Sequence, residues 1–209
     1  MWRRWMRTAL IRRGGWIDTN HDHHTYMSNF KFIEQDVNIA KILKQVLDNP
    51  ADWQAVSSYK NIEGDLKPYG FLPLVMAMVK HSGDDPKNTE MQARTPLYDK
   101  YTEIRKWLRQ RNITTTSRAA FFRLKPGGTV GRHIDDGTYY LTRDRFHLSL
   151  QGSYRYTVDD EVHIIKPGTF FWFDNKKYHA AENVSDIDRV TFVFDLPHSL
   201  RPIHKLLKD

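Results

Sequence analysis

The sequence contains no cysteine. Disulfide bonds, thiolate metal ligands and a cysteine nucleophile are therefore excluded, and histidine, aspartate and glutamate are the strong metal ligands left to the chain. Ten histidines are present. Any metal site predicted from this sequence must be built from imidazole and carboxylate groups.

Long apolar runs are also missing. The longest, from Phe71 to Val79, spans nine residues and includes Pro73, whereas a membrane-spanning helix needs roughly 20 residues. The stretch from Thr8 to Ile11 lies between arginines and is shorter than the apolar core of a secretory signal. We therefore predict a cytoplasmic protein without a membrane span, or a mitochondrial protein if the Arg-rich start is a presequence.

Acidic residues are absent before Asp18, and this segment carries five arginines. The whole chain has 32 basic and 25 acidic residues, a net charge of +7, so residues 14 to 209 carry only 7 − 5 = +2. We expect residues 1–30 to be a flexible basic extension of a nearly balanced domain. This distribution argues against nucleic acid as the main partner, but a non-enzymatic basic binding module stays open as an alternative.

Residues 31–113 are predicted to be the helical part of a single domain that spans residues 31–209. Apolar positions between Asp36 and Asn49 recur at helical spacing, and Asn49-Pro50 ends the pattern. A second helix is predicted from Pro96 to Gln110. We also assign the apolar run from Phe71 to Lys80 to a helix, although periodicity alone does not distinguish it from a strand.

The pattern changes at about Thr114, where short β-branched and aromatic runs alternate with turn residues. Six strands are predicted: Ala119–Leu124, Arg145–Leu150, Tyr154–Val158, Val162–Ile165, Thr169–Phe173 and Arg189–Asp195. The connections are too short for crossover helices, which indicates antiparallel hairpins in a sandwich or barrel. We therefore predict an α+β fold in which the helices cover one sheet of a β-rich core at residues 114–197, followed by a tail at 198–209.

Three residues of this core form a candidate metal site. In an extended backbone His133 and Asp135 point to the same side, because strand side chains alternate. A rolled sheet would bring His179 beside them, since it follows the aromatic strand. Two imidazoles and one carboxylate make up the facial triad of non-haem Fe(II) oxygenases. The spacing alone is weak evidence in a chain with ten histidines.

Two strands add a cationic face to this site. In Arg189–Asp195 the residues Val190, Phe192 and Phe194 share one face, which leaves Arg189 and Thr191 on the other. An arginine inside a small barrel is costly unless it is paired, and a carboxylate ligand would pair with it through two hydrogen bonds. In the same way, Arg145, His147 and Ser149 share the polar face of the strand Arg145–Leu150. The alternative is a solvated face of an antiparallel sheet.

Together these motifs resemble the aspartyl/asparaginyl β-hydroxylase family of 2-oxoglutarate- and Fe(II)-dependent oxygenases. The resemblance covers about Ala119 to Pro197. It consists of a Pro-Gly turn before the first ligand, an R-x-H step, a second Pro-Gly turn, an aromatic-Asp step, a distal histidine, an asparagine turn and a final arginine. These motifs correspond to Pro126-Gly127, Arg145 and His147, Pro167-Gly168, Phe173-Asp174, His179, Asn183 and Arg189.

The resemblance implies a double-stranded β-helix, also called a jelly roll, with a cupin-like barrel. It implies that His133, Asp135 and His179 hold Fe(II), that Arg189 binds the distal carboxylate of 2-oxoglutarate, and that Arg145 and His147 lie near its iron-chelating end. With O2 as the oxidant, the reaction would hydroxylate an unactivated C–H bond and release succinate and CO2. The substrate would be a small molecule or peptide, of amino-acid or Asp/Asn type.

Two departures from the family pattern concern the site. Some members have glycine in place of the carboxylate ligand, whereas Asp135 is present here, which favours a three-ligand site. Near Phe122 the family can place a serine that helps to bind the cosubstrate, and this chain has Phe121-Phe122-Arg123 instead. A cupin-like metal isomerase or dioxygenase that does not use 2-oxoglutarate is a further alternative, but its usual H-x-H motif with a following glutamate is not found between Arg132 and Gly137.

Overall fold

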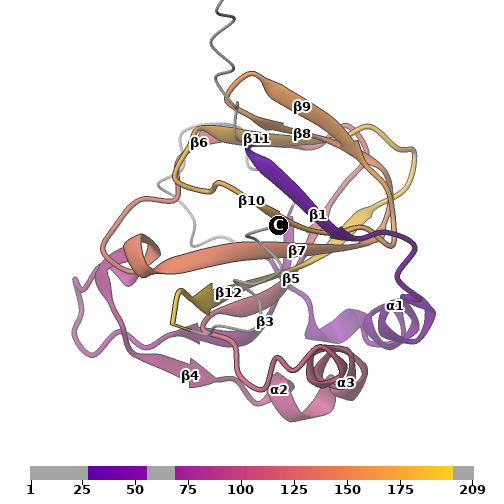
Figure 1. The fold of residues 1–209 in the computed structure, drawn as a ribbon. Coiled ribbons are helices and arrows are strands. Elements are labelled where there is room, and N and C mark those ends of the chain that lie inside the picture. Colours follow the sequence, from indigo (N-terminus) through magenta and orange to yellow (C-terminus); the bar gives the residue numbers. More distant parts are fainter. Residues whose placement is uncertain (1–27, 56–68, 200–209) are drawn as a thin grey trace, which may run out of the picture.

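A computed structural model describes residues 28–55 and 69–199. Two antiparallel sheets are stacked on each other (Figure 1). The major sheet has the order β1-β10-β7-β12-β5-β3-β2, with β4 paired to β3, and the minor sheet has the order β6-β11-β8-β9. From β5 onward the chain passes between the two sheets, which is the strand arrangement of the predicted jelly roll.

The strands of the major sheet are β1 (Phe30–Glu34), β2 (Gln54–Ala55), β3 (Tyr69–Ala77), β4 (Gln92–Arg94), β5 (Ala119–Leu124), β7 (Arg143–Gln151), β10 (Phe170–Phe173) and β12 (Arg189–Pro197). Those of the minor sheet are β6 (Thr129–His133), β8 (Tyr154–Val158), β9 (Glu161–Ile165) and β11 (His179–Asn183). The helices are α1 (Ala40–Leu47), α2 (Leu97–Lys100) and α3 (Thr102–Gln110).

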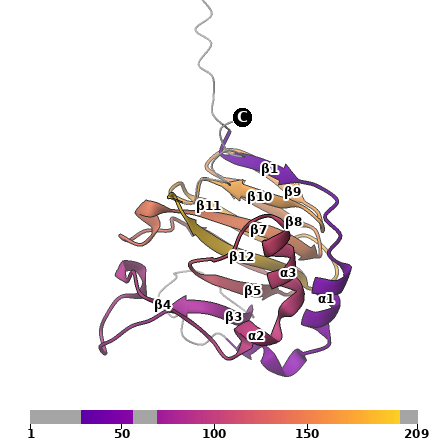
Figure 2. The same cartoon turned by 60° about the horizontal axis from the view of Figure 1, so that its bottom comes forward.

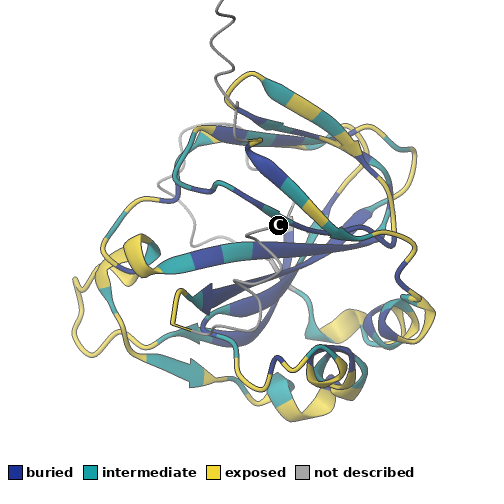
Figure 3. Ribbon diagram, viewed as in Figure 1, coloured by how far each residue is buried: buried dark blue, intermediate teal, exposed yellow. Residues whose placement is uncertain are grey.

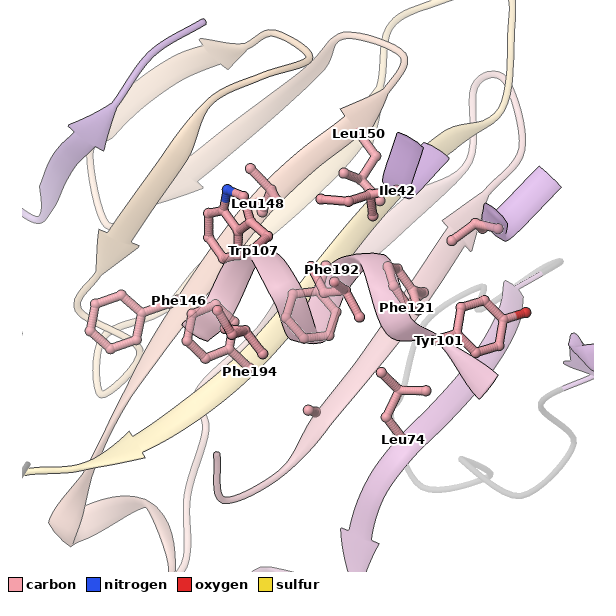
Figure 4. Packing of buried hydrophobic residues seen from close by; sticks show 14 of the residues in the cluster. Ile42, Leu74, Tyr101, Trp107, Phe121, Phe146, Leu148, Leu150, Phe192 and Phe194 are labelled. Carbon is pink, nitrogen blue, oxygen red and sulfur yellow. The ribbon is translucent and has the colours of Figure 1, made fainter. Parts of the chain in front are cut away.

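The larger core lies between the major sheet and the helices, which cover its outer face (Figure 2). Val190, Phe192 and Phe194 of β12 point to this side, as predicted from their alternation. Figure 4 shows Phe192, Phe194 and Phe146 next to one another in the cluster, with successive ring centroids 5.3 Å and 5.5 Å apart. The buried central strands and the exposed outer sides of the helices are visible in Figure 3.

A smaller core fills the space between the two sheets. It contains Phe171 and Phe173 from β10 and Tyr154, Tyr156 and Val158 from β8. Because strand residues alternate between faces, Phe170 of β10 points to the helices, whereas Phe171 and Phe173 point to the inside of the roll. The inside of the roll is therefore lined by aromatic rings from both sheets, together with the polar faces of β7 and β12.

The predicted helix from Phe71 to Lys80 is wrong, because this run forms β3. Its residues pair with β5 from Tyr69 opposite Leu124 to Val75 opposite Ala119. Pro73 has no N–H to donate, and it sits where a bulge shifts the register. From Phe71 to Val75 the run is buried on both faces, and an apolar pattern of this kind carries no period that separates strand from helix.

The other helical predictions for residues 31–113 are correct only in part, because four strands also form in this region. α1 begins at Ala40 rather than Asp36, because Asp36 has a φ of 60°, outside the right-handed helical region. The helix predicted from Pro96 to Gln110 is interrupted at Tyr101, whose ψ is 72°. The side chain of Tyr101 is fully buried, and its hydroxyl donates to Asp52 over 2.8 Å.

Residues 28–30, predicted as the end of the flexible extension, belong to the folded domain instead. The hydroxyl of Ser28 and the backbone N–H of Asn29 both donate to Glu161, and Phe30 starts β1. Residues 1–27 and most of the predicted tail, 200–209, lie outside the described residues. Within residues 28–55 and 69–199, no helix is long and apolar enough to cross a membrane.

Replacement of Phe192 by alanine tests the larger core. Its ring is fully buried and lies 4.9 Å from that of Phe121. We expect the free energy of unfolding to fall by about 3–5 kcal/mol, measured by urea denaturation. The control Val162→Ala changes a residue that is 51% exposed on β9, and should cost less than about 1 kcal/mol. Equal losses for the two variants would contradict this description of the core.

Candidate metal and cosubstrate site

His133, Asp135 and His179 lie together at one end of the minor sheet. His133 ends β6 and His179 begins β11, and the antiparallel register places the two directly opposite each other. Asp135 follows two residues after His133. The Nε2 atom of His133 is 3.9 Å from Oδ1 of Asp135, and the Nε2 atom of His179 is 4.0 Å from Oδ2. One ligand atom from each residue lies within 4.8 Å of the others.

Both imidazoles are oriented by the backbone. Nδ1 of His133 is 2.8 Å from the carbonyl oxygen of Gly131, and Nδ1 of His179 is 2.9 Å from that of Lys177. Since a carbonyl oxygen can only accept, each Nδ1 carries a proton, and in the neutral form of each imidazole the lone pair is therefore on Nε2. This outer hydrogen bond is the usual support of a metal-binding histidine. The donor set therefore fits a divalent metal.

The charges at the site also fit a metal. Burial opposes ionisation of Asp135, but the charges of Arg145, His179 and His133, with a hydrogen bond from Asn175, hold its pKa below the ordinary value. Burial lowers the pKa of His179 to about 4. At neutral pH the site thus offers an anionic carboxylate and a neutral imidazole, which are the protonation states that metal binding requires.

Arg145 lies beside the triad, but it is already paired. Its Nε and Nη2 atoms donate to the two oxygens of Asp195 over 2.8 and 3.0 Å, and Nη1 lies 2.9 Å from Oδ2 of Asp135. Nη2 also donates to the hydroxyl of Tyr140. Sequence reasoning missed the role of Asp195, although this residue ends the predicted strand, because the pairing depends on the register that sets it opposite Arg145.

Arg189 is buried inside the roll, with 4% of its surface exposed. Its Nε donates to Thr191 over 2.9 Å, and its guanidinium carbon lies 3.9 Å from the centre of the Tyr154 ring. Asp195 shares its strand face but pairs with Arg145. Within the described part of the chain, no carboxylate lies at ion-pair distance from Arg189, so a buried cation is left for an anionic ligand.

Unpartnered polar atoms accompany Arg189. Nδ1 of His147, the hydroxyl of Ser149 and the hydroxyl of Tyr154 are buried and have no hydrogen-bond partner among the described residues. Thr191 pairs with Ser149, and Val193 with His147. His147 and His179 both contact the ring of Phe173, at 5.1 and 4.9 Å between centroids. A row of polar groups thus leads from the triad to Arg189. We name this row, His147, Ser149, Tyr154, Thr191 and Arg189, the polar lane.

The polar lane has the character of a ligand-binding site. Buried polar atoms without partners are rare in folded proteins and call for a ligand or ordered water. Phe122 of β5 lies opposite Thr191, at the position where the family can place serine. Thr191 and Ser149 lie on the polar strand faces that the sequence predicts. No pattern in the sequence indicates that Tyr154 and Asn175 belong to the site.

The sequence matches the model of the family described as Aspartyl/Asparaginyl beta-hydroxylase over residues 31–199. The chain belongs to this family. The match covers most of the chain, including the metal triad and the polar lane, and it extends the resemblance to the region before Ala119. As a member of the family, the protein is an enzyme of the 2-oxoglutarate-dependent hydroxylase class, and the non-enzymatic binding module is set aside.

Solved structures agree with the fold. An oxidoreductase of the 2OG-Fe(II) oxygenase family from Burkholderia pseudomallei has a TM-score of 0.53 at 12% identity, covering 77% of this chain and 79% of that chain. A cupin domain of Cnp3 from Schizosaccharomyces pombe covers 44% of this chain and 64% of its own, at 14% identity and a TM-score of 0.35. At 12% identity the likeness to the Burkholderia structure concerns the fold alone, and together with the strand order of the two sheets it agrees with the predicted double-stranded β-helix. No curated protein matches the sequence.

Replacement of His179 by alanine tests the triad. The variant loses an imidazole of the candidate site that is 3% exposed, so we expect binding of Mn(II) or Co(II), measured by titration calorimetry, to fall below detection. The control His163→Ala removes an imidazole of β9 that pairs with Glu161 and should leave metal binding unchanged. Metal binding by His179→Ala that equals that of the unchanged protein would rule out the triad as the site.

Proposed function

We propose that the protein is an Fe(II)- and 2-oxoglutarate-dependent oxygenase that hydroxylates an unactivated C–H bond of an amino-acid or peptidyl substrate of the Asp/Asn type. Succinate and CO2 are the co-products. His133, Asp135 and His179 bind the iron through their Nε2 and carboxylate oxygen atoms. Arg189 binds the distal carboxylate of 2-oxoglutarate.

One observation carries this proposal: three residues that could hold a metal ion share a polar interior with a buried arginine that has no carboxylate partner among the described residues. A facial triad leaves three adjacent coordination positions free. A keto acid needs two of them, and its far carboxylate needs a cation. Arg189 supplies that cation in a buried site, where a charge-assisted pair is stronger than in water.

The residues of the polar lane position the cosubstrate. Thr191 holds the Nε side of Arg189, so the two Nη groups remain for a carboxylate. The hydroxyls of Ser149 and Tyr154 are donors that have no partner in the described residues. Burial and the nearby charges of Arg189 and Arg145 keep the pKa of His147 well below its usual value. This imidazole is therefore neutral, and it adds no further positive charge to the lane.

The aromatic residues of the smaller core exclude water from the same space. Phe171, Phe173 and Tyr156 surround His147 at 5.1 to 5.4 Å between ring centroids. When bound, iron and 2-oxoglutarate would supply the oxidising chemistry together with O2, of which one oxygen atom would enter the succinate formed as the keto acid loses CO2 and the other the hydroxyl group of the product. The protein orients the reactants and limits side reactions by keeping the interior dry. His133, with 23% of its side chain exposed, marks the side of the triad that faces solvent.

Turnover of 2-oxoglutarate is the direct test of this function. We expect succinate formation that requires Fe(II), O2 and a substrate from a panel of free amino acids and Asp- or Asn-containing peptides. O2 consumption and succinate should rise together with the hydroxylated product, detected as an added oxygen by mass spectrometry. Product formation that does not depend on 2-oxoglutarate would instead favour the cupin-like isomerase or dioxygenase.

Replacement of Arg189 by alanine separates the two ligands. Loss of a charge-assisted pair of about 1.5–3 kcal/mol should weaken 2-oxoglutarate binding roughly 10- to 100-fold, seen as a rise in its KM. Metal affinity without cosubstrate should remain. Arg155→Ala is the matched control, because Arg155 pairs with Glu182 on the exposed face of the minor sheet. An unchanged KM for 2-oxoglutarate in Arg189→Ala would contradict the assignment of this arginine.

A further inference from the structure

Arg145 bridges two buried carboxylates, one of which belongs to the triad. It forms two hydrogen bonds with Asp195, and its Nη1 lies 2.9 Å from Oδ2 of Asp135. The exposed fractions of the three side chains are 17% for Arg145, 1% for Asp195 and 8% for Asp135. Family resemblance assigns Arg145 to the cosubstrate, yet its strongest contacts are to these two acids.

Asp195 is held firmly in its place. Its backbone N–H donates to the carbonyl of Arg118, and its own carbonyl accepts from Ser117. Its Oδ2 atom also accepts from the hydroxyl of Tyr139 over 3.1 Å, and Tyr139 is fully buried. Because both carboxylate oxygens of Asp195 are hydrogen-bonded, the plane and direction of the guanidinium of Arg145 are fixed by the sheet.

This arrangement holds one oxygen of Asp135 to the protein. Oδ2 accepts a hydrogen bond of 3.0 Å from Asn175 and lies 2.9 Å from Arg145, and it is also 4.0 Å from Nε2 of His179. Oδ1 lies 3.9 Å from Nε2 of His133, and it has no hydrogen bond among the described residues. A carboxylate with one oxygen held by the protein presents the other oxygen to a metal in a defined direction.

We propose that Asp195, acting through Arg145, is a positioning residue for Asp135. This inference rests on the proposed function of the triad. Asp195 takes up much of the positive charge of Arg145 through two hydrogen bonds, so Asp135 stays available to a cation although a guanidinium is next to it. Without Asp195 the guanidinium is free to turn fully onto Asp135, where it competes with the metal for the same carboxylate.

The test measures metal affinity in the absence of 2-oxoglutarate. We expect Asp195→Asn to weaken Mn(II) or Co(II) binding by about tenfold or more in titration calorimetry, which is the usual effect of changing an outer partner of a metal ligand. Arg145→Lys should have a similar effect, because an ammonium group lacks the planar fork that spans both acids. The Arg145→Lys variant keeps the positive charge at this position, and it therefore provides the test if Asp195→Asn does not fold.

Asp188→Asn is the matched control, since Asp188 pairs with Lys125 and Arg123 away from the triad. It should bind metal as the unchanged protein does. The absorption spectrum of bound Co(II) adds a readout of coordination geometry, and it should change in Asp195→Asn but not in Asp188→Asn. Circular dichroism checks that each variant is folded.

The outcomes separate this inference from the proposed function. Folded Asp195→Asn and Arg145→Lys variants with unchanged metal affinity would overturn the inference. If, in addition, the KM for 2-oxoglutarate rises in Arg145→Lys alone, Arg145 acts in cosubstrate binding and not in positioning Asp135. If the unchanged protein binds no divalent metal, or if His179→Ala binds it equally well, the proposed function itself fails.

Discussion

The alternation of side chains on β7 and β12 is the constraint on which the rest of the structure depends. Each strand carries apolar residues on one face and polar or charged residues on the other. The aromatic face of β12 packs under the helices in the larger core. This packing fixes which way the strand faces, and it therefore forces Arg189 and Asp195 into the roll. A slip of one residue would reverse both faces, so the core that stabilises the fold also sets the orientation of the site.

The carboxylates inside the roll are distributed unevenly, and this difference gives the two inward-facing arginines different roles. Arg145 lies between two acids and is satisfied by the protein itself. Arg189 has a hydroxyl and an aromatic ring as its neighbours, and its charge is left for a ligand. A buried ion pair stabilises a fold weakly at best, because desolvation offsets the attraction. Burying these charges lowers the free energy of unfolding, and we attribute their presence to the function of the site and not to stability.

The sequence predicted most of the jelly roll and of the site, for physical reasons that also explain the errors. Strands such as Tyr154–Val158 were identified because one buried and one less buried face give a period of two. β6 and β11 were not predicted as strands, since Gly131 and the run His179-Ala180-Ala181 carry little of the β-branched pattern. The apolar run that begins at Phe71 has no alternation of apolar and polar residues, because β3 is buried on both faces there, and its sequence therefore does not distinguish a strand from a helix. The placement of Asp195 at the site depends on the strand register, and that of Asn175 on the path of a loop. No local sequence pattern encodes either of them.

A crystal structure with Mn(II) and 2-oxoglutarate, obtained without O2, tests the central claim most directly. We expect one metal ion bound by Nε2 of His133, Nε2 of His179 and Oδ1 of Asp135, with the far carboxylate of the keto acid on the guanidinium of Arg189. A metal bound elsewhere, or a carboxylate that does not contact Arg189, would contradict this claim.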